Sequence, residues 1–202
     1  MRVTAATKEA TRQRIRESAR ELFQSQGFEA TTTRDIAKAA GIAAGTMFNY
    51  FASKEAVVME FVREALEAAD ESSRKRVREG MSLGEELFSL ISAGLRELRS
   101  LRRFLRPAME WGFSPAADSE DGRIIRGHHL ERVAVILQKH QEEPATSVQL
   151  QMYWMLFTGL LTFWTADESR HQEGTLALLD QSMQMYETWL TNTPGMDVRI
   201  SK

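Results

Sequence analysis

Cysteine is absent from the 202 residues of the sequence. Its absence excludes disulfide bonds, zinc sites with thiolate ligands and catalysis by a cysteine nucleophile. Proline is scarce, with 4 residues, and the chain contains no low-complexity tract. The composition, 43% hydrophobic and 27% charged, is typical of a globular protein. Residues 1–30 lack the apolar segment of a signal peptide, which favours a cytoplasmic location.

Long hydrophobic runs are scarce as well. The most apolar run, MYWMLFTGLLTFWTA at residues 152–166, is shorter than the roughly 20 residues that a helix needs to cross a bilayer. Polar and acidic residues stand at both of its ends, so we expect no contact with a membrane. A helix that is apolar almost all round predicts burial instead, here against a second copy of the chain.

No segment shows the sustained alternation of a β-strand, and every long segment has helical periodicity. The sequence therefore predicts an all-α fold, with a three-helix N-terminal domain over residues 1–53 and a helical bundle over 54–202. Pro107 is expected to kink or divide its helix, and residues 112–122 are expected to form a mobile loop. The predicted helices span 8–26, 33–40, 44–51, 53–78, 83–101, 103–112, 121–142, 146–167 and 174–192.

Charge is divided unevenly along the chain, whose net charge is −2. Residues 1–56 hold nine basic and six acidic residues, whereas the remainder holds 17 basic and 22 acidic ones. A basic head on an acidic body weakly favours a nucleic-acid partner for the head. Within this head, Arg12, Arg16 and Arg20 lie four residues apart on one helix face, a spacing typical of a solvated surface.

The stretch TTTRDIAKAAGIAAGTMFNYFASKEAVV, residues 31–58, contains two short helical patterns that Gly41 separates. Thr32 or Thr33 is a suitable N-cap for the first helix. The second helix has Ala, Gly, Thr, Asn and aromatic residues where a surface helix normally carries Lys and Glu. This arrangement predicts a helix-turn-helix whose second helix lies in the major groove of DNA, because small side chains let the backbone approach closely.

Residues 10–58, with FQSQGFEATTTRDIAKAAGIAAGTMFNYFASKEAVV, resemble the DNA-binding head of the TetR family of one-component transcriptional regulators. The resemblance implies that Thr33 and Lys54 bind phosphates and that Thr46 and Asn49 face base edges. Two alternatives stay open: Phe48 and Tyr50 could pack on the preceding helix, and Lys54 could be a helix-start charge. The predicted DNA-binding residues are Thr33, Arg34, Ala44, Gly45, Thr46, Phe48, Asn49, Tyr50 and Lys54.

Two positions depart from the pattern of the family. Ala43 stands where the family commonly has a Ser or Thr that caps the recognition helix, and loss of an N-cap costs about 0.5–2 kcal/mol. Phe48 stands where a Tyr is common, so one phosphate-binding hydroxyl is missing. Specific recognition of bases then depends chiefly on Thr46 and Asn49, and an Asn can bind adenine in a bidentate fashion.

The resemblance also implies a homodimer whose last two helices form a four-helix bundle with their partners, although the same helices could complete an intramolecular core. A dimer with two heads predicts a palindromic operator. The function implied is that of a repressor that a small-molecule effector releases from DNA, with an activator as the alternative. The predicted dimer interface consists of Leu161, Trp164, Leu179, Met183, Tyr186 and Leu190.

A pocket for the effector is expected in the helical body, among aromatic and sulfur-containing residues that could equally belong to the core. Because His128 and His129 are adjacent, at most one of them points inward, and neither a metal nor a cofactor is expected. The candidate pocket residues are Phe104, Met109, Trp111, Phe113, His128, Trp154 and Phe157.

An enzyme is the competing class of protein. The sequence has no Ser-His-Asp signature, no glycine-rich phosphate loop and no paired Glu-x-x-His motifs of a di-iron bundle. We therefore expect no enzymatic activity, and a helical enzyme or an interaction module is the remaining alternative.

Overall fold

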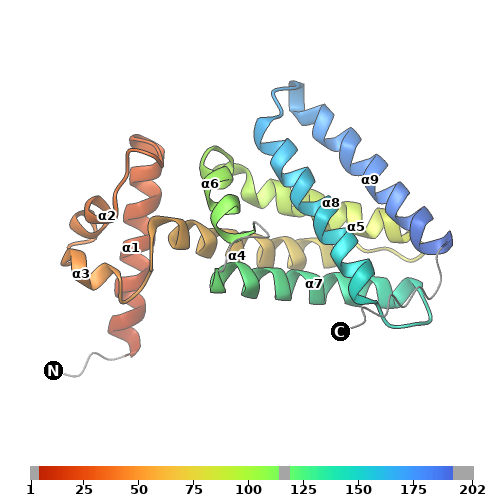
Figure 1. Ribbon diagram of the computed structural model, residues 1–202, viewed down its shortest axis with the longest axis horizontal. Coiled ribbons are helices and arrows are strands. Elements are labelled where there is room, and N and C mark those ends of the chain that lie inside the picture. Colours follow the sequence, from red (N-terminus) through yellow and green to blue (C-terminus); the bar gives the residue numbers. More distant parts are fainter. Residues whose placement is uncertain (1–4, 114–118, 193–202) are drawn as a thin grey trace, which may run out of the picture.

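The computed structural model describes residues 5–113 and 119–192, and over these residues its secondary structure is helical, without strands. A small N-terminal head and a larger helical body lie at opposite ends of an elongated molecule (Figure 1). The predicted all-α fold is confirmed. The elements are α1 Ala5–Ser25, α2 Thr33–Ala39, α3 Ala44–Met47, α4 Lys54–Arg74, α5 Leu83–Glu97, η1 Leu98–Leu101, α6 Arg102–Gly112, α7 Glu120–His140, α8 Ser147–Ala166, η2 Arg170–Gln172 and α9 Glu173–Asn192.

The head is held together by a small apolar core. Ile15 of α1, Ile36 of α2 and Met47 of α3 are all fully buried, and burial of one such side chain stabilises a fold by about 1.5–3 kcal/mol. Of the two candidate caps for α2, Thr32 is the one used. Its hydroxyl accepts a hydrogen bond from the Asp35 amide, and the Asp35 carboxylate accepts one from the Thr32 amide, which together form a capping box.

Helix α4 connects the head to the body. The Ser53 hydroxyl caps it by accepting a hydrogen bond from the Ala56 amide, and the helix then continues to Arg74, four residues short of the predicted end. It packs on α1 in the head and on α5, α6 and α7 in the body. One uninterrupted helix thus belongs to both parts.

The arginines of α1 do not form the solvated face that their spacing suggests. Arg12 donates two hydrogen bonds to Glu60 of α4, at 2.8 and 3.2 Å, and Arg16 pairs with Glu64 one turn further along. The guanidinium of Arg20 lies 4.5 Å from the ring centre of Phe61. The expectation of a solvated face is therefore wrong for Arg12 and Arg16, because their partners come from a helix that is distant in the sequence, whereas Arg20 is exposed.

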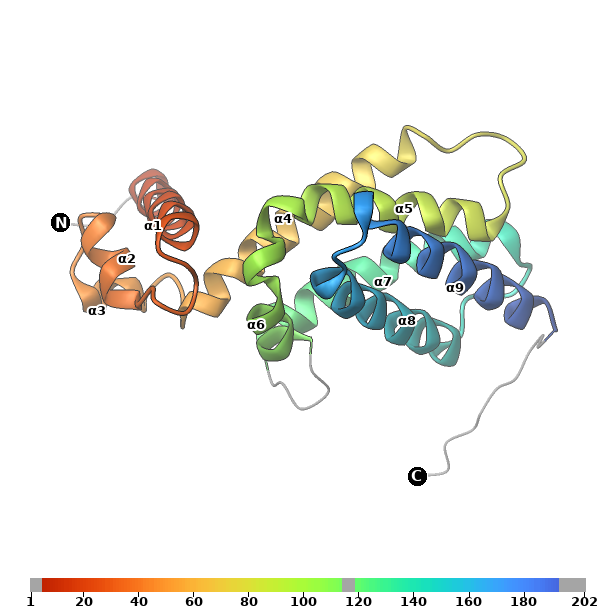
Figure 2. The ribbon, with the colours of Figure 1, turned by 90° about the horizontal axis from the view of Figure 1, so that it is seen from above.

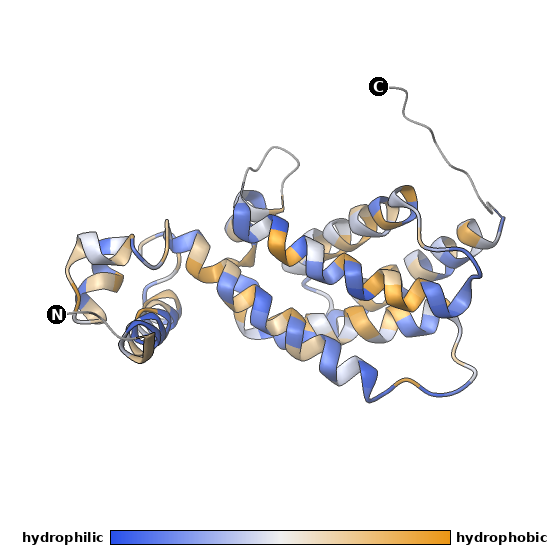
Figure 3. Cartoon of the chain, turned by 90° about the horizontal axis from the view of Figure 1, so that it is seen from below, coloured by the Kyte–Doolittle hydropathy of each residue, from blue (hydrophilic) through white to orange (hydrophobic). Residues whose placement is uncertain are grey.

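In the body, α9 lies between α5 and α8, and α7 packs on α4 and α5 (Figure 2). Hydrophobic residues are spread along the body helices (Figure 3). Pro107 lies inside α6, which continues unbroken to Gly112, so the proline does not divide the helix. Most of the predicted mobile loop, residues 114–118, lies outside the described residues. Within 5–113 and 119–192, no helix has both the length and the apolar character that a membrane crossing requires.

Candidate nucleic-acid interface

Helices α2 and α3 are joined by the tight turn that the sequence predicts. The Ile42 amide donates to the Ala37 carbonyl at 2.9 Å, which folds the turn back on α2. Gly41 occupies this turn with φ +67°, a conformation that side-chain-bearing residues rarely adopt. Met47 is fully buried and anchors α3 on the head. The opposite side of α3 therefore faces solvent.

The recognition helix is shorter than predicted. Its α-helical part ends at Met47, and the chain continues in tight turns, in which the Asn49 amide donates to the Thr46 carbonyl at 3.1 Å. The predicted helical span 44–51 is thus corrected to 44–47. Ala43 occupies the N-cap with extended backbone but supplies no side-chain hydrogen bond, so the missing cap is confirmed.

The predicted DNA-binding residues share one end of the head. Phe48 is 58% exposed, which contradicts the alternative that it packs on α2. Tyr50 is half-buried and packs on the core. The exposed members are Arg34, Ala44, Gly45, Phe48 and Asn49, and the half-buried ones are Thr33, Thr46, Tyr50 and Lys54.

Lys54 is already bound within the head. Its ammonium donates to the carbonyl oxygens of Phe28 and Glu29, at 2.7 and 3.4 Å, and lies 4.2 Å from the ring centre of Phe28. These bonds attach the start of α4 to the connection between α1 and α2. An ammonium has three donors, so one of them is left for a phosphate.

The candidate pocket residues of the body pack on one another. The ring centres of Phe113 and Trp154 are 5.2 Å apart and those of Trp154 and Phe157 are 5.6 Å apart. Phe104 and Met109 are also buried, while Trp111 is half-buried. These residues form part of the hydrophobic core of the chain.

The inward-pointing histidine is His129, whereas His128 is exposed. His129 is thus the buried member of the pair, and the prediction of His128 as a pocket residue stays untested. The His129 ring stacks on Phe157 with ring centres 4.4 Å apart, and its Nε2 lies 3.0 Å from the Tyr153 hydroxyl. Burial lowers the pKa of His129 to about 4, so the ring is neutral at pH 7. Both histidines border a cavity of about 80 Å³ between α4, α5 and α7.

The residues predicted for the dimer interface fill the core of the chain itself. Leu161, Trp164, Leu179, Met183 and Tyr186 are at most 2% exposed, and a side chain buried in this way is not accessible to a partner. Leu190 is half-buried. The five buried residues are therefore removed from the predicted dimer interface, and the prediction for Leu190 stays untested. The face could not be assigned from the sequence because α8 is apolar almost all round.

Other residues of α8 and α9 present apolar surface that the sequence analysis missed. Met155 and Phe163 of α8 are 58% and 45% exposed, and Leu178 and Met185 of α9 are 38% and 57% exposed. Gly159 is exposed between Met155 and Phe163, and a Cβ built there meets no atom within 4 Å. A signal existed in the spacing of 155, 159 and 163, which are four residues apart and share one helix face.

The head matches the model of a known domain. Residues 15–61 match the N-terminal domain of the tetR family of bacterial regulatory proteins. Residues 15–61 therefore form a tetR-family domain. Among curated relatives, the transcriptional repressor KstR2 of Rhodococcus jostii is 36% identical over 85 residues, 42% of each chain, and KstR2 of Mycobacterium tuberculosis is 47% identical over 51 residues, 25% of this chain and 26% of the relative. The chain thus matches less than half of the length of these curated relatives.

Solved structures of tetR-family regulators share the whole fold. Thermus thermophilus FadR, a TetR-family transcriptional repressor solved in complex with lauroyl-CoA, is 26% identical, with a TM-score of 0.61 over 94% of this chain and 97% of that one. A TetR transcriptional regulator from Nitrosomonas europaea, 18% identical, has a TM-score of 0.66 over 89% and 98% of the two chains. The second likeness concerns the fold alone.

Proposed function

We propose that this chain is a ligand-responsive transcriptional repressor of the tetR family that acts as a homodimer on a palindromic operator. Residues 1–53 are the DNA-binding domain, and residues 54–202 bind the ligand and dimerise. The observation that carries the proposal is the exposed, uncharged side of α3 and of the turn that follows it, with Ala44 and Gly45 on the helix, Asn49 in the turn and Met47 anchoring the helix from behind. The names of the KstR2 and FadR relatives support repression.

The roles of the head residues follow from their positions. Asn49 is exposed and has the amide that binds the edge of adenine, and the half-buried Thr46 lies on the same short segment. Thr33 and Arg34 lie in the first turn of α2, where backbone amides and a cation favour a phosphate. The Phe48 ring is positioned for apolar contact with a thymine methyl group or a sugar.

Dimerisation involves the exposed apolar faces of α8 and α9. Met155, Phe163, Leu178 and Met185 form the contact, and Gly159 lets the partner helix approach closely. A monomer rarely leaves such apolar surface on adjacent helices without a partner. The dimer then presents two heads to successive major grooves, about 34–36 Å apart.

An effector of the body acts on DNA binding by favouring a different spacing of the two heads. By linkage, an effector that weakens DNA binding is itself bound more weakly by the DNA complex, with a typical coupling of about 1–3 kcal/mol. The lauroyl-CoA complex of the Thermus thermophilus relative supports a small-molecule effector within the body. The residues Phe104, Met109, Trp111, Phe113, Trp154 and Phe157 remain candidates for its pocket.

The decisive experiment is selection of bound sequences from random duplex DNA by the purified full chain at about physiological salt. A palindrome whose half-sites lie about one helical turn apart is expected. If no sequence is enriched, the proposal of a repressor that binds DNA without its ligand is wrong.

The role of Asn49 is tested on the selected site. Asn49→Ala should lose specific binding and keep the weak, salt-sensitive binding to unrelated DNA, since phosphate contacts are unaffected. Asn192→Ala, which changes an exposed asparagine at the end of α9, is the control and should bind as the wild type does. An equal loss on all sequences would contradict the base-reading role of Asn49.

A further inference from the structure

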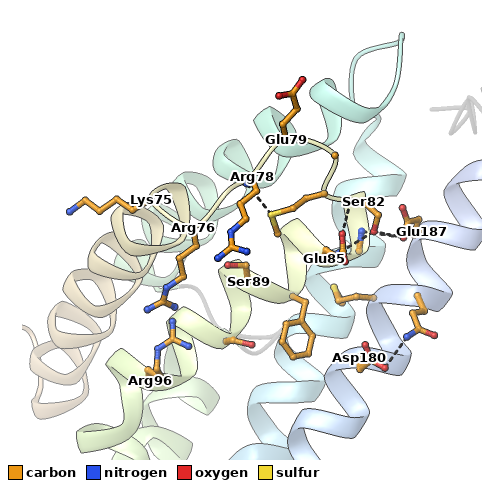
Figure 4. A pocket seen from close by; sticks show the side chains of 17 residues that line it. Lys75, Arg76, Arg78, Glu79, Ser82, Glu85, Ser89, Arg96, Asp180 and Glu187 are labelled. Atoms are coloured by element: carbon orange, nitrogen blue, oxygen red, sulfur yellow. Dashed lines mark hydrogen bonds between the residues drawn. The ribbon is translucent and has the colours of Figure 1, made fainter.

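A groove of about 1080 Å³ lies between the α4–α5 connection, α5 and α9 (Figure 4). It is separate from the recognition surface and from the aromatic cluster around His129. Small-molecule sites usually measure about 300–1,000 Å³, so the space is ample for a metabolite. A second hollow of about 490 Å³ continues along α5 and shares Ser92 and Arg96 with the first.

Three arginines converge on one end of this groove. Figure 4 shows the guanidinium groups of Arg76, Arg78 and Arg96 directed to the same region, near Ser89. Among the described residues, no acidic side chain lies within ion-pair distance of any of the three. Arg74, just before them, does have such a partner. Like charges repel, so an anion bound between these arginines would be stabilised by all three.

The acidic residues that line the groove do not neutralise this end. The Glu187 carboxylate accepts hydrogen bonds at 3.2 Å from the Ser82 hydroxyl and from the first two backbone amides of α5. Glu85 accepts a bond from the Ser82 amide at 2.8 Å, and Asp180 accepts one from a glutamine of its own helix. Glu79 points away from the groove in Figure 4. The carboxylates of Glu187 and Glu85 thus accept hydrogen bonds at the start of α5, and that of Asp180 accepts one within α9.

Part of the lining of the groove is apolar. It contains Phe88, Met81 and the buried Met183. The Ser92 hydroxyl, also in the lining, is buried without a hydrogen-bond partner in the described part of the chain. A buried polar atom without a partner is uncommon in folded proteins, and a polar group of a bound molecule would satisfy it.

We propose that this groove binds a small amphiphile with a phosphate head. The phosphate lies between Arg76, Arg78 and Arg96, because planar guanidinium groups bind phosphate oxygens in a bidentate manner. The apolar part lies over the half-buried Phe88 and Met81. A role of the groove as an effector site rests on the proposed function. Binding of the amphiphile in the groove does not depend on that function.

The test uses dodecyl phosphate, below the concentration at which it forms micelles, and inorganic pyrophosphate. Their binding to the full chain is measured by isothermal titration calorimetry. The double variant Arg76→Gln/Arg78→Gln should bind dodecyl phosphate at least about tenfold more weakly. The control, Arg103→Gln/Arg106→Gln, removes two exposed charges of α6 outside both hollows and should bind as the wild type does.

A third variant, Ser89→Phe, keeps all arginines and fills the groove, so it should lose binding while its thermal unfolding resembles that of the wild type. Pyrophosphate should bind at least about tenfold more weakly than dodecyl phosphate because it lacks an apolar part. Equal affinity of the two double variants, absence of binding by the wild type, or equal affinity for both probes would overturn the proposal.

DNA binding without any probe separates the two proposals. A chain that binds dodecyl phosphate in the groove and selects no DNA sequence would overturn the repressor and leave the groove in place. If the chain selects an operator but does not bind dodecyl phosphate, only the proposal of a binding site in the groove is overturned.

Discussion

Replacement of His129 by glutamine should flatten the dependence of the stability of the body on pH. The pKa of this histidine falls from 6.5 to about 4 in the folded chain because the ring is buried, an effect that the nearby Asp70 opposes in part. The unfolded chain therefore takes up a proton near pH 6.5, and the folded chain does so only near pH 4. Stability from the neutral ring is complete above pH 6.5 and is lost as the pH falls to 4.

The magnitude follows from the difference of pKa. Each unit corresponds to 1.36 kcal/mol, so the free energy of unfolding should fall by up to about 3 kcal/mol more in the wild type than in His129→Gln over this range. Other groups titrate in both proteins and cancel in the comparison. Glutamine places its terminal amide near the Nε2 position and can keep the bond to the Tyr153 hydroxyl.

Urea unfolding at several pH values, at one protein concentration, measures the effect. The tryptophan fluorescence of the chain is a suitable signal, because the ring centre of Trp154 lies 6.2 Å from that of His129. The exposed neighbour provides the control, and His128→Gln should keep the pH dependence of the wild type. Identical pH dependence of His129→Gln and the wild type would refute the assignment of the buried neutral ring.

Three further predictions concern α3, the start of α7 and the dimer. Ala43→Ser should stabilise the head by about 0.5–2 kcal/mol in thermal unfolding, because the extended backbone at Ala43 suits an N-cap; an unchanged melting temperature would contradict this. Gly122→Ala should cost at least about 1–3 kcal/mol in urea unfolding, because its Cβ would lie 1.9 Å from the Gly112 carbonyl oxygen. Gly127→Ala, which has open space on the same helix, should cost nothing. Phe163→Asp should yield monomers in sedimentation experiments, and an unchanged dimer would exclude this face of α8 as the interface.

Features that depend on neighbours in the sequence could be predicted. The capping box of Thr32 and Asp35 and the cap at Ser53 are local hydrogen bonds between residues three apart, and the residue types at those positions are sufficient to indicate them. The turn at Gly41 follows from the left-handed backbone that glycine adopts easily. The order of the helices is predictable for the same reason, whereas several of their ends are not.

Features that depend on packing between distant segments could not be predicted. Arg12 and Glu60 are 48 residues apart, so no periodicity in α1 indicates their contact. The choice between His128 and His129 depends on which one the rotation of α7 turns toward Tyr153. Likewise, α3 ends at Met47 because of how the head packs, although the residues that follow are compatible with a helix.

The contacts between head and body suggest how the proposed effector would act. Rings connect the two parts in series: Phe28 lies 5.1 Å from Phe23, and Phe23 lies 5.5 Å from Phe104 of α6, measured between ring centres. The Phe28 carbonyl in turn accepts a bond from Lys54 at the start of α4. We therefore expect a shift of α6 to displace α1, and we expect the ion pair of Arg12 with Glu60 to resist rotation of α1 about α4. An effector that moves α6 must overcome the resistance of this ion pair. How strongly it changes the spacing of the heads then depends on how far the free energy of effector binding exceeds that resistance.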